Sequence, residues 1–138
     1  MTALTYEITL STKGFGDTHD ITARVARCIE KSGFQAGTAT VFVPGSTAGV
    51  TTIEFESGAV ADLHAALERM APEDVHYAHD ARWGDGNGFS HVRAALLSPS
   101  LSVPFSEGRL LLGTWQQVVV LDFDNRPRKR RVVIQVVG

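Results

Sequence analysis

Residues 115–137 of the chain read WQQVVVLDFDNRPRKRRVVIQVV, and this stretch gives the strongest indication of the fold. β-branched and other apolar residues crowd segments 115–123 and 130–137, as is typical of β-strands, and turn-forming residues separate them over 124–128. We therefore expect two long strands that pair as a hairpin. With further strands expected over 101–105 and 110–112, the last third of the chain is predicted to be entirely β.

The first two thirds of the chain mix strand patterns with helix patterns. Apolar and polar residues alternate over Leu4–Leu10, and segments 36–43 and 50–56 are rich in β-branched residues, so three strands are expected. Helical spacing of apolar residues predicts about three helices, one from Asp17 or Thr18 to Ser32, one over 57–70 and a short one over 89–97. Helices gathered early and strands gathered late indicate an α+β fold.

Length and composition set the broad class of the protein. The 138 residues, 43% hydrophobic and 20% charged, predict one globular domain that spans residues 1–138. A net charge of −2 gives no overall attraction to nucleic acid or to an acidic membrane, and neither is expected as a partner. The lone Cys28, an N-terminus without a signal-peptide pattern and the lack of any apolar run near ~20 residues predict a cytoplasmic protein.

One local charge run stands out against this balance. Residues 126–131 hold five cations in six positions, at a turn that enters a strand. Because no aromatic residues for base stacking lie beside the run, we expect it to protect a strand edge or to contact another subunit rather than to bind RNA.

The densest group of polar residues lies in the least regular segment of the chain. His79, Asp85, Asn87 and His91 place two imidazoles, a carboxylate and an amide within a short stretch. Two histidines and a carboxylate suit Zn²⁺, whereas Asp with Asn suits Mg²⁺. Two other interpretations stay open: the histidines act as acid and base without a metal, or the segment holds turn residues and surface histidines only.

Three other features bear on ligand binding. Residues 44–49, PGSTAG, resemble an anion-binding loop but lack the lysine and following helix of a phosphate-binding loop, which favours a plain turn. Arg109, with Thr114 and Gln116 nearby, suits a phosphate or carboxylate, although glycines 108 and 113 equally indicate turns or bulges. Glu54 falls on the polar face of its predicted strand, where it would simply meet solvent.

Taken together, several of these stretches resemble the YjbQ family, also called the secondary thiamine-phosphate synthase enzyme family. The stretches that carry the resemblance are VPGSTA (43–48) with Glu54, the segment from Tyr77 to His91, LSVP (101–104) and GRLLLGTWQ (108–116). The resemblance implies a distorted β-sandwich with about three helices, assembled as a homotrimer. It also implies a weak or secondary thiamine-phosphate synthase activity, which joins a pyrimidine methyl diphosphate to a thiazole phosphate and releases diphosphate.

The resemblance assigns residues to roles. It implies catalytic roles for His79, Asp85, His91 and Glu54. It implies that Asn87, Thr114 and Gln116 belong to the same polar pocket, where we expect them to contact substrate. If the family activity holds, we expect Arg109 and the hydroxyls of Ser46 and Thr47 to contact the departing diphosphate. A divalent ion, Zn²⁺ or Mg²⁺, would be held by His79, Asp85 and His91. Many relatives have a histidine at the position of Gly45, so a ligand or acid–base group expected there is missing from this chain.

Two other functions compete with the transferase. In one, the histidines and Asp85 hold a metal that activates water, and the protein is a phosphate-ester hydrolase. In the other, the domain binds a small phosphorylated ligand without catalysis.

Overall fold

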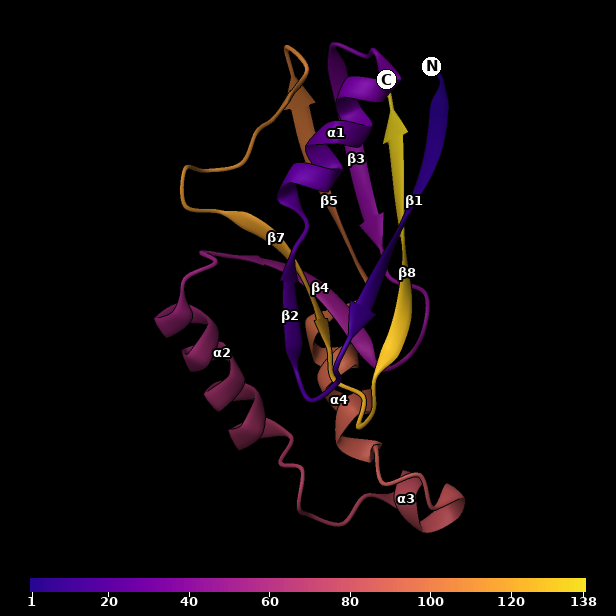
Figure 1. The fold of residues 1–138 in the computed structure, drawn as a ribbon, viewed down its shortest axis with the longest axis vertical. Coiled ribbons are helices and arrows are strands. Elements are labelled where there is room, and N and C mark those ends of the chain that lie inside the picture. The colour runs from indigo at the N-terminus through magenta and orange to yellow at the C-terminus, as the bar shows by residue number, and fades with distance from the viewer.

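The structure, a computed structural model, describes residues 1–138 and confirms the α+β class (Figure 1). Eight strands and four helices follow one another along the chain in this order: β1 (Ala3–Thr12), β2 (Asp17–Asp20), α1 (Thr22–Ser32), β3 (Ala36–Phe42), β4 (Ala48–Ile53), α2 (Ser57–Met70), α3 (Ala78–Trp83), α4 (Gly88–Leu97), β5 (Ser100–Ser106), β6 (Arg109–Leu110), β7 (Gln117–Asp122) and β8 (Arg128–Val137).

The strands form two antiparallel sheets. One sheet has five strands in the order β1-β8-β3-β5-β6, and the other has three in the order β2-β7-β4. The main hydrophobic core lies between them, and α1 contributes Val25, Cys28 and Ile29 to it. Figure 1 shows α1 in front of the upper part of the larger sheet, with the smaller sheet below it.

Strand β7 has buried side chains on both of its faces. Val118 and Val120 point into the main core between the sheets. Val119, Leu121 and Phe123 point the other way, into a second cluster with residues of α2 and α4. A strand covered on both faces needs apolar residues at every position, which explains the uninterrupted apolar run in its sequence.

The expected hairpin of the last two strands is wrong. β7 pairs with β2 and β4, whereas β8 pairs with β1 and β3 in the other sheet. The chain changes sheets through residues 123–127. In its sheet, β8 buries alternate residues, whereas β7 is buried on both faces. The same crossing brings charged residues of both strands together in the interior.

The helices also differ from the expectation of about three. A fourth helix, α3, forms in the segment that looked least regular, and it ends at Gly84, whose φ of 72° suits a helix terminus. The first helix starts later than expected, at Thr22, because Asp17–Asp20 pairs with β7 as a strand. The Asp20 carboxylate accepts a hydrogen bond from the Thr22 amide at 3.0 Å, which supports the start of α1.

No helix combines the length and the apolar composition that a membrane span requires. Figure 1 places α3, α4 and the β7–β8 connection at one end of the molecule, the lower end in that view. The polar residues of that end build the candidate site.

Candidate functional site

A buried ion pair lies where the chain passes from β7 to β8. Asp122 is fully buried and Arg130 is 8% exposed. Arg130 donates from Nε to Asp122 Oδ2 at 2.7 Å and from Nη2 to Asp122 Oδ1 at 2.8 Å. Thr12 of β1 donates to the same carboxylate at 2.5 Å. Paired and hydrogen-bonded in this way, the two charges are tolerated in the interior.

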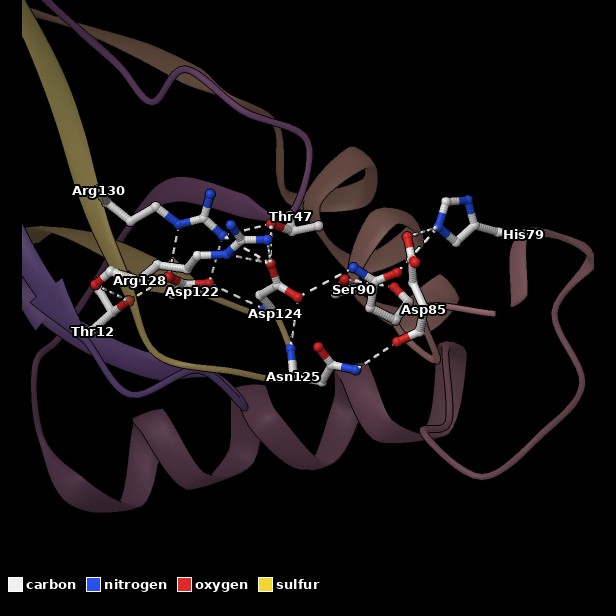
Figure 2. A network of polar contacts seen from close by, with 11 residues as sticks. Thr12, Thr47, His79, Asp85, Ser90, Asp122, Asp124, Asn125, Arg128 and Arg130 are labelled. Atoms are coloured by element: carbon white, nitrogen blue, oxygen red, sulfur yellow. Dashed lines mark hydrogen bonds and ion pairs between the residues drawn. The ribbon is translucent and has the colours of Figure 1, made fainter. Parts of the chain in front are cut away.

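A second carboxylate, Asp124, extends the network toward the helices (Figure 2). It is fully buried and accepts hydrogen bonds from Arg128 Nε at 2.8 Å, Asn87 Nδ2 at 3.2 Å and the Asn125 amide at 2.8 Å. Burial alone would raise the pKa of Asp124, but the hydrogen bonds from Asn87, Arg128 and Asn125 lower it to about 2. Asp124 is therefore ionised at neutral pH and acts only as an acceptor.

The ionised Asp124 fixes the proton of His79 through Asn87. Because Asp124 only accepts, Asn87 must direct its NH₂ group to it and its carbonyl oxygen Oδ1 elsewhere. That oxygen lies 3.1 Å from His79 Nε2. Only an Nε2–H donor satisfies this contact, so His79 carries its proton on Nε2, and Nδ1 holds the lone pair when the ring is neutral.

His79 and His91 lie side by side, although they come from different helices. His79 is in α3 and His91 is in α4, and their ring centroids are 4.4 Å apart with the planes tilted by 54°. Asp85, in the loop between the helices, places Oδ2 3.6 Å from His79 Nε2. The structure thus brings together four of the predicted residues, and both rings are half-buried rather than fully exposed.

The predicted metal ligands do not converge as a metal site requires. Nowhere do three or more His, Cys, Asp and Glu side chains form a group that would hold a metal ion. His79 also directs a proton, not a lone pair, toward Asn87 and Asp85. The Zn²⁺ or Mg²⁺ site at His79, Asp85 and His91 stays a prediction, and the chemistry proposed below is derived from the side chains alone.

Two small cavities lie near the histidines. One cavity, of 280 Å³, is formed by Asp85, Asn87, Asn125, Arg126 and Arg128, none of them hydrophobic. Asp85 and Asn87 both contact His79 from this cavity. The other cavity, of 230 Å³, is formed by Gly45, Ser46, Ala48, His91, Ala94, Ala95 and Pro99. A ligand in the second cavity would contact His91, whereas a ligand in the first would contact Asp85 and Asn87, the partners of His79.

The two hydroxyls predicted in the 44–49 loop have different surroundings. Ser46 is exposed and lines the cavity of His91. Thr47 is buried: its Oγ1 accepts from Arg130 Nη2 at 2.5 Å and donates to Asp124 at 3.2 Å. The Thr47 hydroxyl thus links the two carboxylate centres of the network.

The remaining predicted residues lie elsewhere in this chain. Glu54 follows β4, Arg109 is in β6, and Thr114 and Gln116 are in the β6–β7 loop, all of them exposed. Gln116 donates to Thr52 at 3.0 Å and lines a separate cavity of 340 Å³. Figure 1 shows the β6–β7 loop on the upper left, away from α3 at the lower right. One chain therefore does not bring this second group to the histidines.

A larger cavity, of 510 Å³, lies between β2 and α2 and contains none of the predicted site residues. Its titratable residues are Glu56 and His64, and His64 Nε2 lies 3.2 Å from the Thr18 hydroxyl oxygen. Burial lowers the pKa of His64, and the Arg93 charge lowers it further, which keeps the ring neutral.

Sequence reasoning missed the four charged residues beneath the histidines. Arg128 and Arg130 were hidden in a basic run, which usually indicates a solvated surface. The signal was their spacing: Asp122 and Asp124 stand two apart on one side of the turn, and the arginines stand two apart on the other. In strands, residues two apart share a face, so this spacing places the two arginines on one face of β8, and the tertiary structure shows that this face points inward.

Comparison with known proteins gives the family. A family model described as "UPF0047 protein YjbQ-like" matches residues 6–138. A UPF0047 protein of Methanothermobacter thermautotrophicus is 38% identical over 138 residues, which cover 100% of this chain and 94% of that one. A UPF0047 protein of Archaeoglobus fulgidus is 37% identical over 129 residues, 94% of this chain and 98% of the relative.

A solved structure with the same fold is that of a YbjQ-like protein of unknown function from Sulfolobus solfataricus, with a TM-score of 0.94 and 28% identity over 99% of this chain and 98% of that chain. A YjbQ/UPF0047 protein of Clostridium acetobutylicum has a TM-score of 0.88 and 32% identity over 96% and 99% of the two chains. The sequence match over nearly the whole chain and the shared fold agree, and the chain belongs to the YjbQ (UPF0047) family.

Proposed function

We propose that the chain is an enzyme that acts on a phosphorylated small molecule, with His79 and His91 as its acid and base. The observation that carries the proposal is the histidine pair itself: two half-buried imidazoles lie 4.4 Å apart, His91 lines the 230 Å³ cavity, and His79 contacts Asp85 and Asn87 of the 280 Å³ cavity. Imidazoles titrate near neutral pH, so a pair of them can exchange protons with a bound substrate under ordinary conditions.

The network below His79 prepares this residue for proton transfer. Since Nε2 donates to Asn87, the lone pair on Nδ1 is the basic site. When Nδ1 takes up a proton, the ring becomes a cation whose Nε2 lies 3.6 Å from the Asp85 carboxylate. The side chains of the network thus hold the ring in one tautomer before any substrate arrives.

The charge of the 280 Å³ cavity supports a phosphorylated substrate. Arg126 and Arg128 line it together with one carboxylate, Asp85, and the Asp124 carboxylate that pairs with Arg128 is buried away from solvent. Arginine N–H groups match the oxygen spacing of phosphate, and a cavity without hydrophobic residues favours a highly charged group.

For the specific reaction of this enzyme, we propose the one that the family resemblance implies, which is thiamine-phosphate synthesis. Departure of diphosphate from a pyrimidine methyl carbon leaves a stabilised cation, so the protein must mainly neutralise the leaving anion and exclude water. Arg109 is the group proposed to neutralise that anion, and the exposed Ser46 hydroxyl is proposed to donate a hydrogen bond to it. The Thr47 hydroxyl, expected to act with them, is buried and donates to Asp124 instead. Because Arg109 is far from the histidines in one chain, this arrangement requires a neighbouring copy in the proposed homotrimer.

Glu54, Thr114 and Gln116 belong to the same second group. In the trimer, we propose that they approach the histidines of the next subunit together with Arg109 and hold the pyrimidine. The physical reason for assembly is the apolar surface around the group: Leu111 and Trp115, in the same loop, are 59% and 72% exposed.

The test is an assay of the purified protein with pyrimidine methyl diphosphate and thiazole phosphate, alongside a panel of phosphate esters. We expect thiamine phosphate as product, with turnover reduced about 100-fold or more in His79→Ala and in His91→Ala. Lys129→Ala, an exposed cation outside the pocket, serves as control and should keep wild-type turnover.

Other outcomes separate the competing functions. Release of inorganic phosphate from esters, abolished by a chelator and without thiamine phosphate, would replace the transferase with a metal-assisted hydrolase. Ligand binding that is weakened in His91→Ala, with no turnover above background in the wild type, would make the domain a binding module and overturn the proposal.

A further inference from the structure

Arg130 holds a free donor group next to the histidine pocket. Its guanidinium carries N–H donors on Nε, Nη1 and Nη2. Nε and Nη2 donate to Asp122 and Thr47, while Nη1 has no acceptor within the protein. Every buried side-chain nitrogen and oxygen has a partner, so Nη1 reaches the solvent even though Arg130 is only 8% exposed.

Gly45 keeps this donor accessible. A Cβ atom at residue 45 would lie 3.1 Å from Arg130 Nη1, within the space that a ligand atom would use. The φ of Gly45 is +119°, a conformation that other residues rarely adopt. The absence of a side chain at this position therefore opens the approach to Nη1 and also fixes the shape of the loop.

Two more polar residues share a cavity with Gly45. Ser46 and His91 line this 230 Å³ cavity together with Gly45 and apolar residues, and Arg130 Nη1 lies behind Gly45. Ser46 is exposed, and its hydroxyl is free to donate. The nearby Asp122 and Asp124 are fully buried and paired with Arg130 and Arg128, so no uncompensated carboxylate faces the cavity from the network.

We propose that Arg130 Nη1, the Ser46 hydroxyl and His91 bind a phosphate group of a small molecule in the space left open at Gly45. A guanidinium, a hydroxyl and a protonated imidazole nitrogen can each donate to a different oxygen of a tetrahedral group. Arg130 cannot move away, because its other N–H groups are held by buried partners, so the donor is pre-organised for the ligand. The inference deepens the proposed function, on which it rests for the identity of the ligand.

The experiment uses inorganic phosphate as probe and the full-length, ¹⁵N-labelled protein. Phosphate is titrated at constant ionic strength while the side-chain resonances of Arg130 are followed by NMR. We expect a saturable shift at Arg130, with binding weakened about tenfold in Gly45→Ala and about threefold or more in Ser46→Ala. Lys129→Ala, whose lysine lies on the opposite face of β8, should bind within about twofold of wild type.

Specific results would overturn the inference. These are an Arg130 resonance that phosphate does not shift, wild-type affinity in Gly45→Ala, and an equal loss in Lys129→Ala, which would indicate general charge attraction. If Gly45→Ala fails to fold, the wild-type titration and Ser46→Ala decide. His79→Ala separates the two proposals, because it should abolish turnover and leave phosphate binding intact. Phosphate binding at Arg130 without any wild-type turnover would contradict the proposed enzymatic function and still support the phosphate-binding site.

Discussion

Arg130 and Asp122 meet through two parallel hydrogen bonds, Nε to Oδ2 at 2.7 Å and Nη2 to Oδ1 at 2.8 Å, where the chain leaves one sheet for the other. The pair is almost completely buried. Its energetics therefore depend on each charge keeping its partner, because an unpaired charge in the interior is strongly destabilising.

The first prediction concerns this pair. Arg130→Met leaves Asp122 buried without its counter-charge, and we expect the free energy of unfolding to fall by about 3–5 kcal/mol in urea denaturation. Arg131→Met is the matched control: Arg131 pairs with Glu7 on the surface, with side chains 58% and 53% exposed. That loss should stay below about 1 kcal/mol. Equal losses in the two variants would contradict the structure.

The second prediction concerns pH. The pKa of Asp124 is about 2 in the folded state, below the ordinary 3.8. The unfolded chain therefore binds this proton first as the pH falls, so the stability from Asp124, about 2 kcal/mol, is present above about pH 4 and lost by about pH 2. A ¹³C titration of the carboxyl group should show the low midpoint, and Asn87→Ala, which removes a donor, should raise it. An unchanged midpoint in Asn87→Ala would show that the hydrogen bond from Asn87 does not lower the pKa of Asp124.

The third prediction concerns the proton of His79. In ¹⁵N spectra of the wild type at neutral pH and above, we expect His79 as the Nε2–H tautomer, because Asn87 Oδ1 accepts from Nε2. Asn87→Ala should release this preference and give a mixture of tautomers. The exposed His76 is an internal reference and should not change. A wild-type His79 with its proton on Nδ1 would refute the chain of contacts from Asp124.

The fourth prediction concerns assembly. If Arg109 serves the histidines of a neighbour, His91→Ala and Arg109→Ala should each lack activity, and refolding them together in equal amounts should restore about one quarter of wild-type turnover, the share of correctly combined sites in random cyclic trimers. Sedimentation should give a trimer. A monomer near 14.9 kDa that persists on concentration, or a mixture that stays inactive, would contradict the shared site.

The fold class could be predicted because the local patterns were clear in most strands. Leu4–Leu10 and β8 bury alternate residues, as their sequences indicate. The partner of β7 could not be predicted, since an uninterrupted apolar run marks a strand buried on both faces and says nothing about which strands flank it. Nor could β2 be predicted: DTHD has no strand pattern, and it is extended because it pairs with β7.

The sequence predicted the histidines of the candidate site and their neighbours, but not the buried ion pairs that support them. The histidines with Asp85 and Asn87 stood out by density in the sequence, and the structure places them together. The buried arginines escaped prediction because a run of basic residues resembles a solvated surface, and only tertiary structure shows which of them face inward. The roles of Arg109 and Glu54 involve a neighbouring chain and stay predictions.

The two-sided burial of β7 has a consequence for the dynamics of the molecule. Its backbone joins the core between the sheets to the cluster beneath α4, the helix that carries His91. Neither cluster can open without exposing the other side of the same strand, so the two should melt as one cooperative unit. The amide protons of Val119 and Val120 should therefore exchange with deuterium only through global opening, and the position of His91 should be as rigid as the interior itself.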